Sequence, residues 1–405
     1  MLLQKINLHN FRGLADVTIQ QMDEHINLFM GVNGAGKSSI LDAISLLMTW
    51  YIRRMLSTNG RGMDIPLDDI RNGANDGCRI GLTLDNGTAW SLYRTKAKEK
   101  AEKSDLSQLN ALLKRMWQRM DAERNAPLPV VVHYRVNRSV ADVPLKIRHL
   151  DEAERTDAYK NTLEGTASFR DFFPWFRMQE DEENEHIRED RNYRDRGLEC
   201  IREAMRRVFP EYSDMKVQRR PQALLLKKRG ETFKLNQLSD GEKCYIAMVC
   251  DLTSRLVMAN PEGCALDGNG IVLIDEVDLH LHPQWQREVL TKLRRTFSNC
   301  QFIVSTHSPI VAADGIGKLF MVSNGDVKSL PMLRGIDYSA ILRDFMDTAS
   351  QDLLVSALVS EYIAYMQHGM NEDADAVMAK LTEMIPDKSS PVYREIKEKL
   401  VNEVY

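Results

Sequence analysis

The stretch GVNGAGKS, residues 31–38, determines the fold that we expect for this chain. It follows an alternating apolar run, Ile26, Leu28 and Met30, that predicts a strand, and apolar residues at helical spacing come after it. A glycine-rich turn between a strand and a helix lets backbone N–H groups surround phosphates, and the helix N-terminus adds a partial positive charge. The pattern therefore predicts a loop that binds the phosphates of a nucleoside triphosphate.

Two side chains of this loop have more specific expected roles. Lys37 can reach the β- and γ-phosphates, and the hydroxyl of Ser38 can coordinate Mg²⁺. The nucleotide contacts that we expect in the loop and at the start of the helix are Asn33, Gly34, Ala35, Gly36, Lys37, Ser38 and Ser39.

The composition is that of an ordinary globular protein. The 405 residues, 43% apolar and 28% charged, suffice for two or three structural units. Because the formal net charge is −4, nucleic-acid binding would require a local basic patch. The six cysteines lack metal-ligand spacing, and neither a signal peptide nor a run of 18 apolar residues is visible. We therefore expect a cytoplasmic protein with reduced thiols and no membrane segment.

The distribution of apolar and polar residues divides the chain into four parts. Residues 1–94 are expected to form strands around one helix. Residues 95–220 are expected to form a mainly helical insertion with a core strand near 130–134. Residues 221–330 would complete the core, and residues 331–405 would form a helical tail that either serves partner docking or oligomerisation, or simply covers the core.

Two acidic residues and a histidine follow two further apolar runs. The run 271–274 ends in Asp275 and Glu276, where an α/β sheet places its ligand chemistry. Asp275 would hold Mg²⁺, and Glu276 would orient or deprotonate an attacking water. The run 301–305 precedes His307, which could hydrogen-bond the γ-phosphate, although a single histidine in such a position is more often structural.

A third motif begins at Ser239, which precedes Glu242 by three residues and is followed by apolar residues at helical spacing. The pattern is typical of a capping box at the start of a helix. The same helix start, with Gly241 beside it, could also bind an anion. Taken alone, the motif leaves both interpretations open.

The motifs at 31–38, 238–242, 275–276 and 307 occur in an order that closely resembles the ABC-type ATPase heads of the SMC and RecF families. The resemblance implies an α/β fold: an ABC-type ATPase head in which a mixed sheet with a phosphate-loop core is joined by an antiparallel β-subdomain. A helical insertion and a helical C-terminal tail would be added to this head. ATP and Mg²⁺ are the implied cofactors, and ATP hydrolysis is the implied activity.

The resemblance also implies roles for individual residues. Asp275 and Glu276 match the Walker B motif, Asp278 the D-loop, and NFRG at residues 10–13 the N-terminal turn where Arg12 would approach the nucleotide. The implied catalytic residues are Lys37, Glu276 and His307. His280 and His282 would have a structural or D-loop role rather than bind a metal. For the Q-loop the sequence offers only open candidates: Arg135, Arg138 or a residue near 69–72.

In heads of this kind two copies would bind head to tail. ATP would lie between Lys37 of one copy and Ser239 and Gly241 of the other, giving an isologous dimer or a higher homo-oligomer. The sequence departs from the family pattern at Asp240, where glycine is usual. A carboxylate close to the γ-phosphate could slow turnover.

Further segments resemble one compact branch of these ATPases. DFFPWFR at 171–177, LSDGEK at 238–243 and YSAILRD at 338–344 are similar to the ATPases of bacterial anti-phage defence, of the Septu and retron type, with the AriA and OLD ATPases as relatives. No long heptad run and no nuclease core are visible in the sequence. The resemblance therefore implies a regulatory ATPase that controls a separately encoded nuclease or toxin effector.

The sequence also allows a second hypothesis for the function. The chain could be a DNA-binding clamp of the RecF or SMC kind in DNA repair, with DNA held by a local basic surface. The candidate residues for that surface are Arg202, Arg206, Arg207, Lys216, Arg219 and Arg220.

Overall fold

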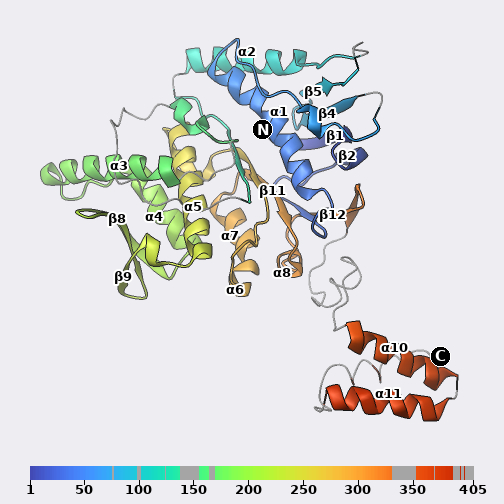
Figure 1. The fold of residues 1–405 in the computed structure, drawn as a ribbon. Helices are drawn as coiled ribbons and strands as arrows, with labels where there is room; N and C mark the ends of the chain where they lie inside the picture. The colour runs from blue at the N-terminus through green and yellow to red at the C-terminus, as the bar shows by residue number, and fades with distance from the viewer. Residues whose placement is uncertain are drawn as a thin grey trace. The chain divides into compact units, whose positions relative to one another are not determined.

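The computed structural model describes residues 1–74, 77–97, 102–123, 125–136, 155–163, 169–330, 353–368, 370–385, 393 and 396. The chain divides into two compact units, Met1–Ile336 and Asp337–Tyr405 (Figure 1). Arg138 and the segment 338–344, both noted in the sequence, lie outside the described residues.

A six-stranded sheet forms the centre of the first unit, in the order β13-β12-β3-β11-β10-β6. All neighbouring pairs are parallel except β12 and β13. Every residue of β3, β6, β10 and β11 is buried, as expected for parallel strands covered on both faces. The strands span β3 Ile26–Met30, β6 Val130–Tyr134, β10 Gly270–Ile274, β11 Cys300–Thr306, β12 Lys318–Ser323 and β13 Asp326–Leu330.

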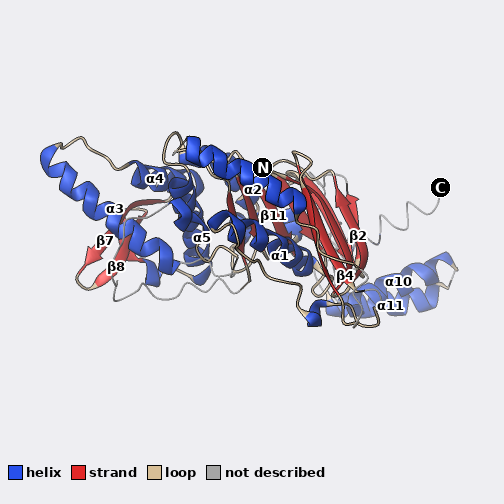
Figure 2. Cartoon of the chain, turned by 90° about the horizontal axis from the view of Figure 1, so that it is seen from above, coloured by secondary structure: helices blue, strands red, loops and turns tan. Residues whose placement is uncertain are grey.

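A four-stranded antiparallel sheet, in the order β2-β1-β4-β5, forms the second layer. Its strands are β1 Leu3–Phe11, β2 Leu14–Gln20, β4 Cys78–Leu84 and β5 Ala89–Arg94. Helix α1, Lys37–Leu56, packs against strands of both sheets (Figure 2). The buried Gln301 in β11 joins the sheets, because its side chain accepts from Leu3 N at 2.7 Å and donates to Leu3 O at 2.9 Å.

The remaining elements of the first unit are helices and a small sheet. The sheet β7-β8-β9 consists of Tyr212–Arg219, Gln222–Lys228 and Glu231–Lys234. The helices are α2 Ser107–Ala122, α3 Phe169–Glu189, α4 Arg196–Val208, α5 Asp240–Ala259, α6 Pro283–Gln286, α7 Val289–Thr296 and α8 Pro309–Ala312, with the 3₁₀ turn η2 at Arg155–Tyr159. Helix α5 packs on α3, α4, η2 and strand β6, so it lies against the edge of the central sheet that β6 forms.

Within the described residues of the second unit, α10 Leu353–Gln367 and α11 Asn371–Met384 pack on each other. Their shared core includes Val359, Ile363, Val377 and Leu381. Of the helices within the described residues, none is both long and apolar enough to cross a membrane.

The predicted α/β class, with a mixed sheet behind the phosphate loop and an antiparallel subdomain, is confirmed. In the insertion predicted for residues 95–220, helix α2 begins only at Ser107, because Asp105 exchanges two backbone hydrogen bonds with Ser91 in β5. The sequence analysis did not predict β7, β12 or β13.

Candidate functional site

The phosphate loop depends on glycine for its shape. Gly34 and Gly36 have φ of 80° and 112°, in a region that other residues rarely adopt. A Cβ atom at Gly31 would lie 2.2 Å from the carbonyl oxygen of Val322 in β12. The loop is therefore tightly supported by the neighbouring strand, and its backbone can approach a ligand closely.

The N-terminus of α1 is open to an anion. Gly36 is the N-cap residue, no side chain of the described residues caps the helix, and its first turn contains no acidic residue. The first N–H groups of a helix lack intrahelical acceptors, so they can bind phosphate oxygens. Lys37, only 6% exposed, donates from Nζ to Gly31 O at 2.7 Å and Val32 O at 3.0 Å.

Three carboxylates lie close enough to Lys37 to act on its charge. Burial lowers the pKa of the Lys37 ammonium, and the negative charges of Glu276, Asp275 and Asp278 partly oppose that effect. The structure thus brings the predicted phosphate loop together with the acidic residues that follow β10.

Asp275 directly follows β10 and is 5% exposed. Its backbone N–H donates to Tyr134 O at 2.8 Å, and its Oδ1 accepts a hydrogen bond from Ser305 Oγ. Together, the Asp275 carboxylate and the exposed Ser38 hydroxyl provide the hard oxygen donors that Mg²⁺ prefers. Among the described residues no cluster of three His, Cys, Asp or Glu could hold a metal; a nucleotide-site Mg²⁺ needs only one or two protein ligands beside phosphates and water.

Glu276 has a φ of 48°, the left-handed conformation that turns the chain away from the direction of β10. Its N–H donates to Ser305 Oγ at 2.8 Å. Ser305 therefore contacts both predicted Walker B acids: its hydroxyl accepts from the N–H of Glu276 and donates to the carboxylate of Asp275. The sequence analysis missed this serine, whose only signal is its position at the end of an apolar run.

The imidazole of His307 lies beside the carboxylate of Asp278. His307 Nδ1 lies 3.4 Å from Asp278 Oδ2, and Thr306 Oγ1 donates to Asp278 Oδ1. The Asp278 side chain is 4% exposed, whereas that of His307 is 45% exposed. The buried carboxylate can orient the imidazole so that its other nitrogen is available to a ligand.

Arg12 lies beside α1 and is held by two carboxylates. Its guanidinium contacts Asp69 at 2.8 Å and Asp42, in α1, at 2.6 Å. Asp42 also pairs with Arg135 at 3.2 Å. Two of the Q-loop candidates, Arg135 and the segment around Asp69, therefore belong to one charged cluster with Arg12.

The motif at Ser239 forms the predicted capping box at the N-terminus of α5. Ser239 N donates to Glu242 Oε2 at 2.9 Å, and Glu242 N donates to Ser239 Oγ at 3.4 Å. Glu242 Oε1 accepts from Tyr212 OH at 2.6 Å and pairs with Lys228. Burial would raise the pKa of Glu242, but the hydrogen bonds from Lys228, Tyr212 and Ser239 outweigh it and lower the pKa to about 2.

Gly241 lies close against the segment that follows β10. A Cβ atom there would lie 1.9 Å from the carbonyl oxygen of His280, so only glycine fits. Ser239 and His280 line a cavity of about 660 Å³ together with Lys228 and Trp285. His282 caps α6 by accepting from Gln284 N at 3.3 Å, in agreement with the structural role predicted for it.

Asp240, where the family pattern has glycine, is 79% exposed and pairs with Lys243 at 2.7 Å. This ion pair lowers the pKa of Asp240 and holds its carboxylate on the outer side of its own helix.

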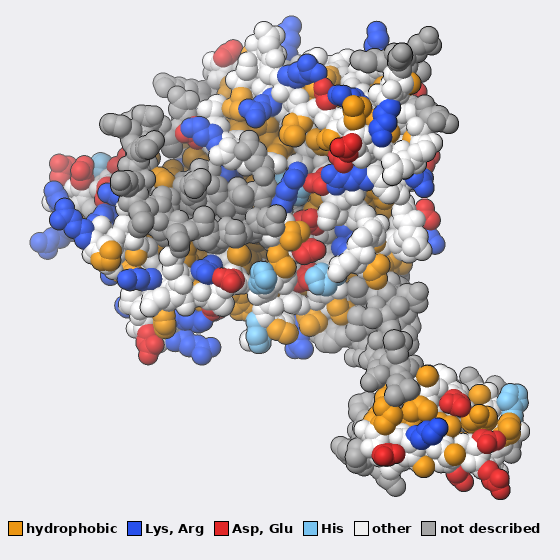
Figure 3. All heavy atoms as spheres, viewed as in Figure 1, with side chains coloured by type: hydrophobic (Ala, Val, Ile, Leu, Met, Phe, Trp, Pro, Cys, Tyr) orange, Lys and Arg blue, Asp and Glu red, His pale blue; other side chains and the backbone are white. Residues whose placement is uncertain are grey.

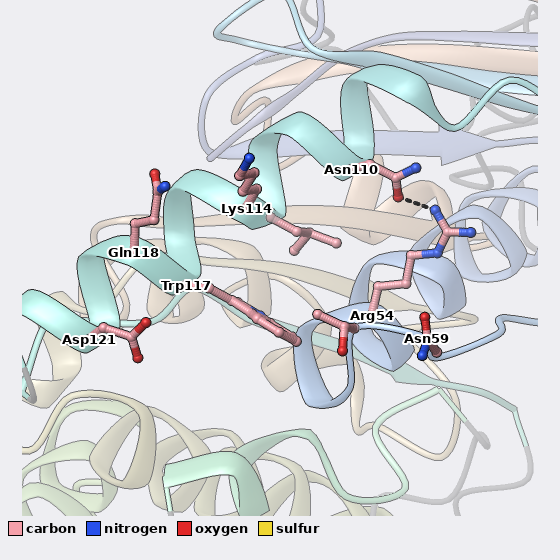
Figure 4. A pocket seen from close by; sticks show the side chains of 9 residues that line it. Arg54, Asn59, Asn110, Lys114, Trp117, Gln118 and Asp121 are labelled. Atoms are coloured by element: carbon pink, nitrogen blue, oxygen red, sulfur yellow. Dashed lines mark hydrogen bonds between the residues drawn. The ribbon is translucent and has the colours of Figure 1, made fainter.

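A separate groove, away from the cavity beside Ser239, lies between the C-terminal end of α1 and helix α2 (Figure 4). Its volume is about 670 Å³, and Arg54, Asn110, Lys114, Trp117 and Asp121 are among the residues that line it. Arg54 donates to Asn110 across the groove, as Figure 4 shows. The groove is lined by none of the residues predicted for the nucleotide site.

The model of one protein family matches residues 26–313 of the chain. The family is described as an AAA domain, putative AbiEii toxin, Type IV toxin–antitoxin system. The match spans the phosphate loop, the Ser239 motif, the Walker B acids and His307. The chain belongs to this AAA-domain family, and it is an ATPase.

Three relatives agree with the resemblance found in the sequence. The chain is 31% identical over 364 residues to the retron Vc95 probable ATPase of Vibrio cholerae serotype O1 biovar El Tor, covering 76% of this chain and 71% of that one. It is 28% identical over 454 aligned residues to the retron Ec83 probable ATPase of Escherichia coli, covering 93% and 83%. The Septu protein PtuA of Bacillus mycoides (strain KBAB4) is 46% identical over 77 residues, 19% of this chain and 10% of that one.

Among solved structures, the SMC head domain from Thermotoga maritima is 19% identical, with a TM-score of 0.43 over 82% of this chain and 99% of that one.

Proposed function

We propose that this chain is the ATPase subunit of an anti-phage defence system. It binds and hydrolyses ATP in head-to-tail dimers and thereby controls a separately encoded nuclease or toxin effector. The similarity to the retron ATPases supports the defence role, and the division of the site between two surfaces of one chain supports the dimer.

One observation carries the proposal. The segment 275–280 begins with acids that act on the charge of Lys37, where they would complete the phosphate site, and ends at His280, which contacts α5 at Gly241. One short segment thus joins a nucleotide-binding surface to a second surface that carries Ser239. In a head-to-tail dimer each segment would contact both nucleotides.

The chain's own residues supply the expected chemistry. The α1 N–H groups and Lys37 hold the phosphates, with Arg12 beside them. Ser38 and Asp275 would hold Mg²⁺, which neutralises phosphate charge when bound. Glu276 accepts a proton from the attacking water, and His307, oriented by Asp278, hydrogen-bonds the γ-phosphate. The partner copy would close the site with Ser239 and Gly241.

The DNA-clamp alternative receives less support, because most of its candidate residues are already paired with acids. Arg202 pairs with Glu183 and Glu199, Arg206 and Arg207 pair with Glu203, and Arg219 pairs with Glu180 and Asp181. On the face shown in Figure 3, basic and acidic side chains are interspersed. Paired arginines offer little net charge to a phosphate backbone.

Affinity purification of the tagged Glu276→Gln variant from its native host, with and without ATP, tests the proposal. A stoichiometric nuclease or toxin, identified by mass spectrometry, is the expected result. DNA that is retained by the chain alone and released by salt would instead favour the clamp.

A further inference from the structure

A network of buried polar side chains connects the central sheet to α5. Tyr134, the last residue of β6, is fully buried and donates from its hydroxyl to Asp251 Oδ2 at 2.8 Å. Arg255 Nε donates to the same oxygen at 2.8 Å, and the side chains of this ion pair are only 2% and 3% exposed. Asp251 and Arg255 are both in α5.

Tyr134 bonds both to Asp275, in one half of the proposed site, and to α5, the helix whose N-terminus carries the other half. Its carbonyl oxygen accepts the backbone N–H of Asp275 at 2.8 Å, next to the Walker B carboxylate. Its hydroxyl reaches Asp251, which stands 12 residues after Ser239 in sequence and therefore about 18 Å along the same helix. A single residue thus links Asp275, the proposed Mg²⁺ ligand, to the helix capped by Ser239.

Arg255 extends this network to a third segment. Its Nη1 donates to the carbonyl oxygens of Ala158 and Lys160, at 3.0 and 2.9 Å, in and just after η2. Burial raises the pKa of Tyr134 well above its ordinary value, and the Asp251 charge adds to that effect, so the phenol stays protonated and remains a donor.

The free energy needed to remove two charges from water commonly exceeds the free energy gained from their attraction, so a buried ion pair is a weak source of stability. Its best-attested use is to fix one arrangement of the elements that it joins. Here those elements are β6, α5 and the η2 segment, and the first two support opposite halves of the proposed site.

We infer that Tyr134 and Asp251 are positioning residues, which couple the position of Asp275 to that of α5, the helix capped by Ser239. The inference rests on the proposed head-to-tail dimer. A shift of Asp275 on nucleotide binding would be passed to the Tyr134 backbone, and the Tyr134 hydroxyl would hold α5 in the orientation that presents Ser239 to the partner's nucleotide.

The substitution Tyr134→Phe tests this inference, because it removes only the hydroxyl and keeps the Asp251–Arg255 pair. We expect the Kd for ATP to stay within about twofold, whereas the dimer Kd in ATP, measured in a Glu276→Gln background, rises about 10-fold. The kcat per bound nucleotide should fall by a similar factor of about 10, with an unchanged KM.

Tyr159→Phe is the matched control. Tyr159 is the last residue of η2 and is 2% exposed. Its hydroxyl donates to Pro129 O at 2.8 Å, and no hydrogen bond from this hydroxyl to α5 is found among the described residues, so the substitution leaves the carbonyls bound by Arg255 in place. It should leave the dimer Kd and kcat near their wild-type values. As a second variant, Asp251→Asn should reproduce the Tyr134→Phe pattern of intact nucleotide binding and weakened dimerisation.

The outcomes separate the inference from the function on which it rests. A wild-type-like dimer Kd and kcat in Tyr134→Phe overturns the inference alone. Equal losses in Tyr134→Phe and Tyr159→Phe also overturn it, because any buried hydroxyl would then suffice. Absence of an ATP-dependent dimer in the Glu276→Gln protein itself overturns both the inference and the proposed function.

Discussion

The N-termini of α1 and α5 carry the two halves of the proposed nucleotide site, yet their first turns are built in opposite ways. Helix α1 begins at a glycine, without a side-chain cap and without an acidic residue in its first turn. Helix α5 begins with a complete capping box and has Asp240 and Glu242 in its first turn. One helix end is open to an anion, and the other already holds a carboxylate of its own.

The difference predicts an order of events. The α1 terminus, with Lys37 beside it, can bind ATP in a single chain. At α5, Oε2 of Glu242 accepts a hydrogen bond from Ser239 Oγ at 2.8 Å. A phosphate of the nucleotide bound to the partner copy would have to compete with this carboxylate for the Ser239 hydroxyl. Dimer closure should therefore depend on a small rearrangement of Glu242 toward Lys228 and Tyr212, which already bind its other oxygen.

The largest effect is expected at the chemical step. Glu276→Gln should lower ATP turnover about 1000-fold, because the amide cannot accept the proton of the attacking water. ATP binding should persist, since Lys37 and the α1 terminus are unchanged. Single-turnover hydrolysis with labelled ATP measures the rate, and Glu288→Gln, on an exposed side chain, is the control. Turnover equal to wild type would remove Glu276 from its catalytic role.

The next largest effect is expected at the uncapped N-terminus of α1. Lys37→Ala should weaken ATP binding about 100-fold, through the loss of charge-assisted hydrogen bonds to two phosphates. Equilibrium dialysis gives the Kd. Lys292→Ala, which removes a lysine paired with Glu288 on α7, should bind ATP normally. If both variants bind alike, the phosphates lie elsewhere.

A smaller effect, a gain in dimer affinity, is expected at the capped N-terminus of α5. Glu242→Gln removes the negative charge from the α5 terminus and leaves Lys228 without its carboxylate partner, so the ATP-dependent dimer should tighten about fivefold. Analytical ultracentrifugation in the Glu276→Gln background measures it. Glu203→Gln, which removes a paired carboxylate from α4, should have no effect. A weaker dimer would show that the Glu242 charge assists closure.

The smallest effect concerns stability and pH. The pKa of Glu242 is lowered from 4.5 to about 2 in the folded state. The contribution of its charged form to the free energy of unfolding is therefore complete above about pH 4.5 and is lost as the pH falls toward 2. The difference in melting temperature between wild type and Glu242→Gln should therefore narrow between pH 4.5 and pH 2. A difference that stays constant over this range would contradict the assignment.

Local patterns in the sequence were sufficient to predict much of this molecule. The glycines and Lys37 of the phosphate loop, and the capping box of Ser239 and Glu242, lie within a few residues of one another, so their chemistry can be recognised without the fold. Strand β13 was missed because most of its residues are exposed, and it lacks the apolar run that identified β10 and β11.

Other features depend on contacts between distant segments. Ser305 contacts both Walker B acids only because β11 lies beside β10. Arg12 pairs with Asp42 and Asp69, and Glu242 pairs with Tyr212. The residues of each pair are at least 30 positions apart, so the pairing follows from packing. Nothing in the local sequence distinguishes these side chains from others of the same type.

The central claim is that each ATP lies between Lys37 of one copy and Ser239 of another. Complementation tests it most directly: Lys37→Ala and Ser239→Arg proteins, each inactive alone, are mixed and assayed for ATP hydrolysis. A head-to-tail dimer of the two variants has one site with both lesions and one intact site, so the mixture should recover hydrolysis. Mixing that restores no activity at any ratio, while Ser239→Arg alone still binds ATP, would contradict the shared site.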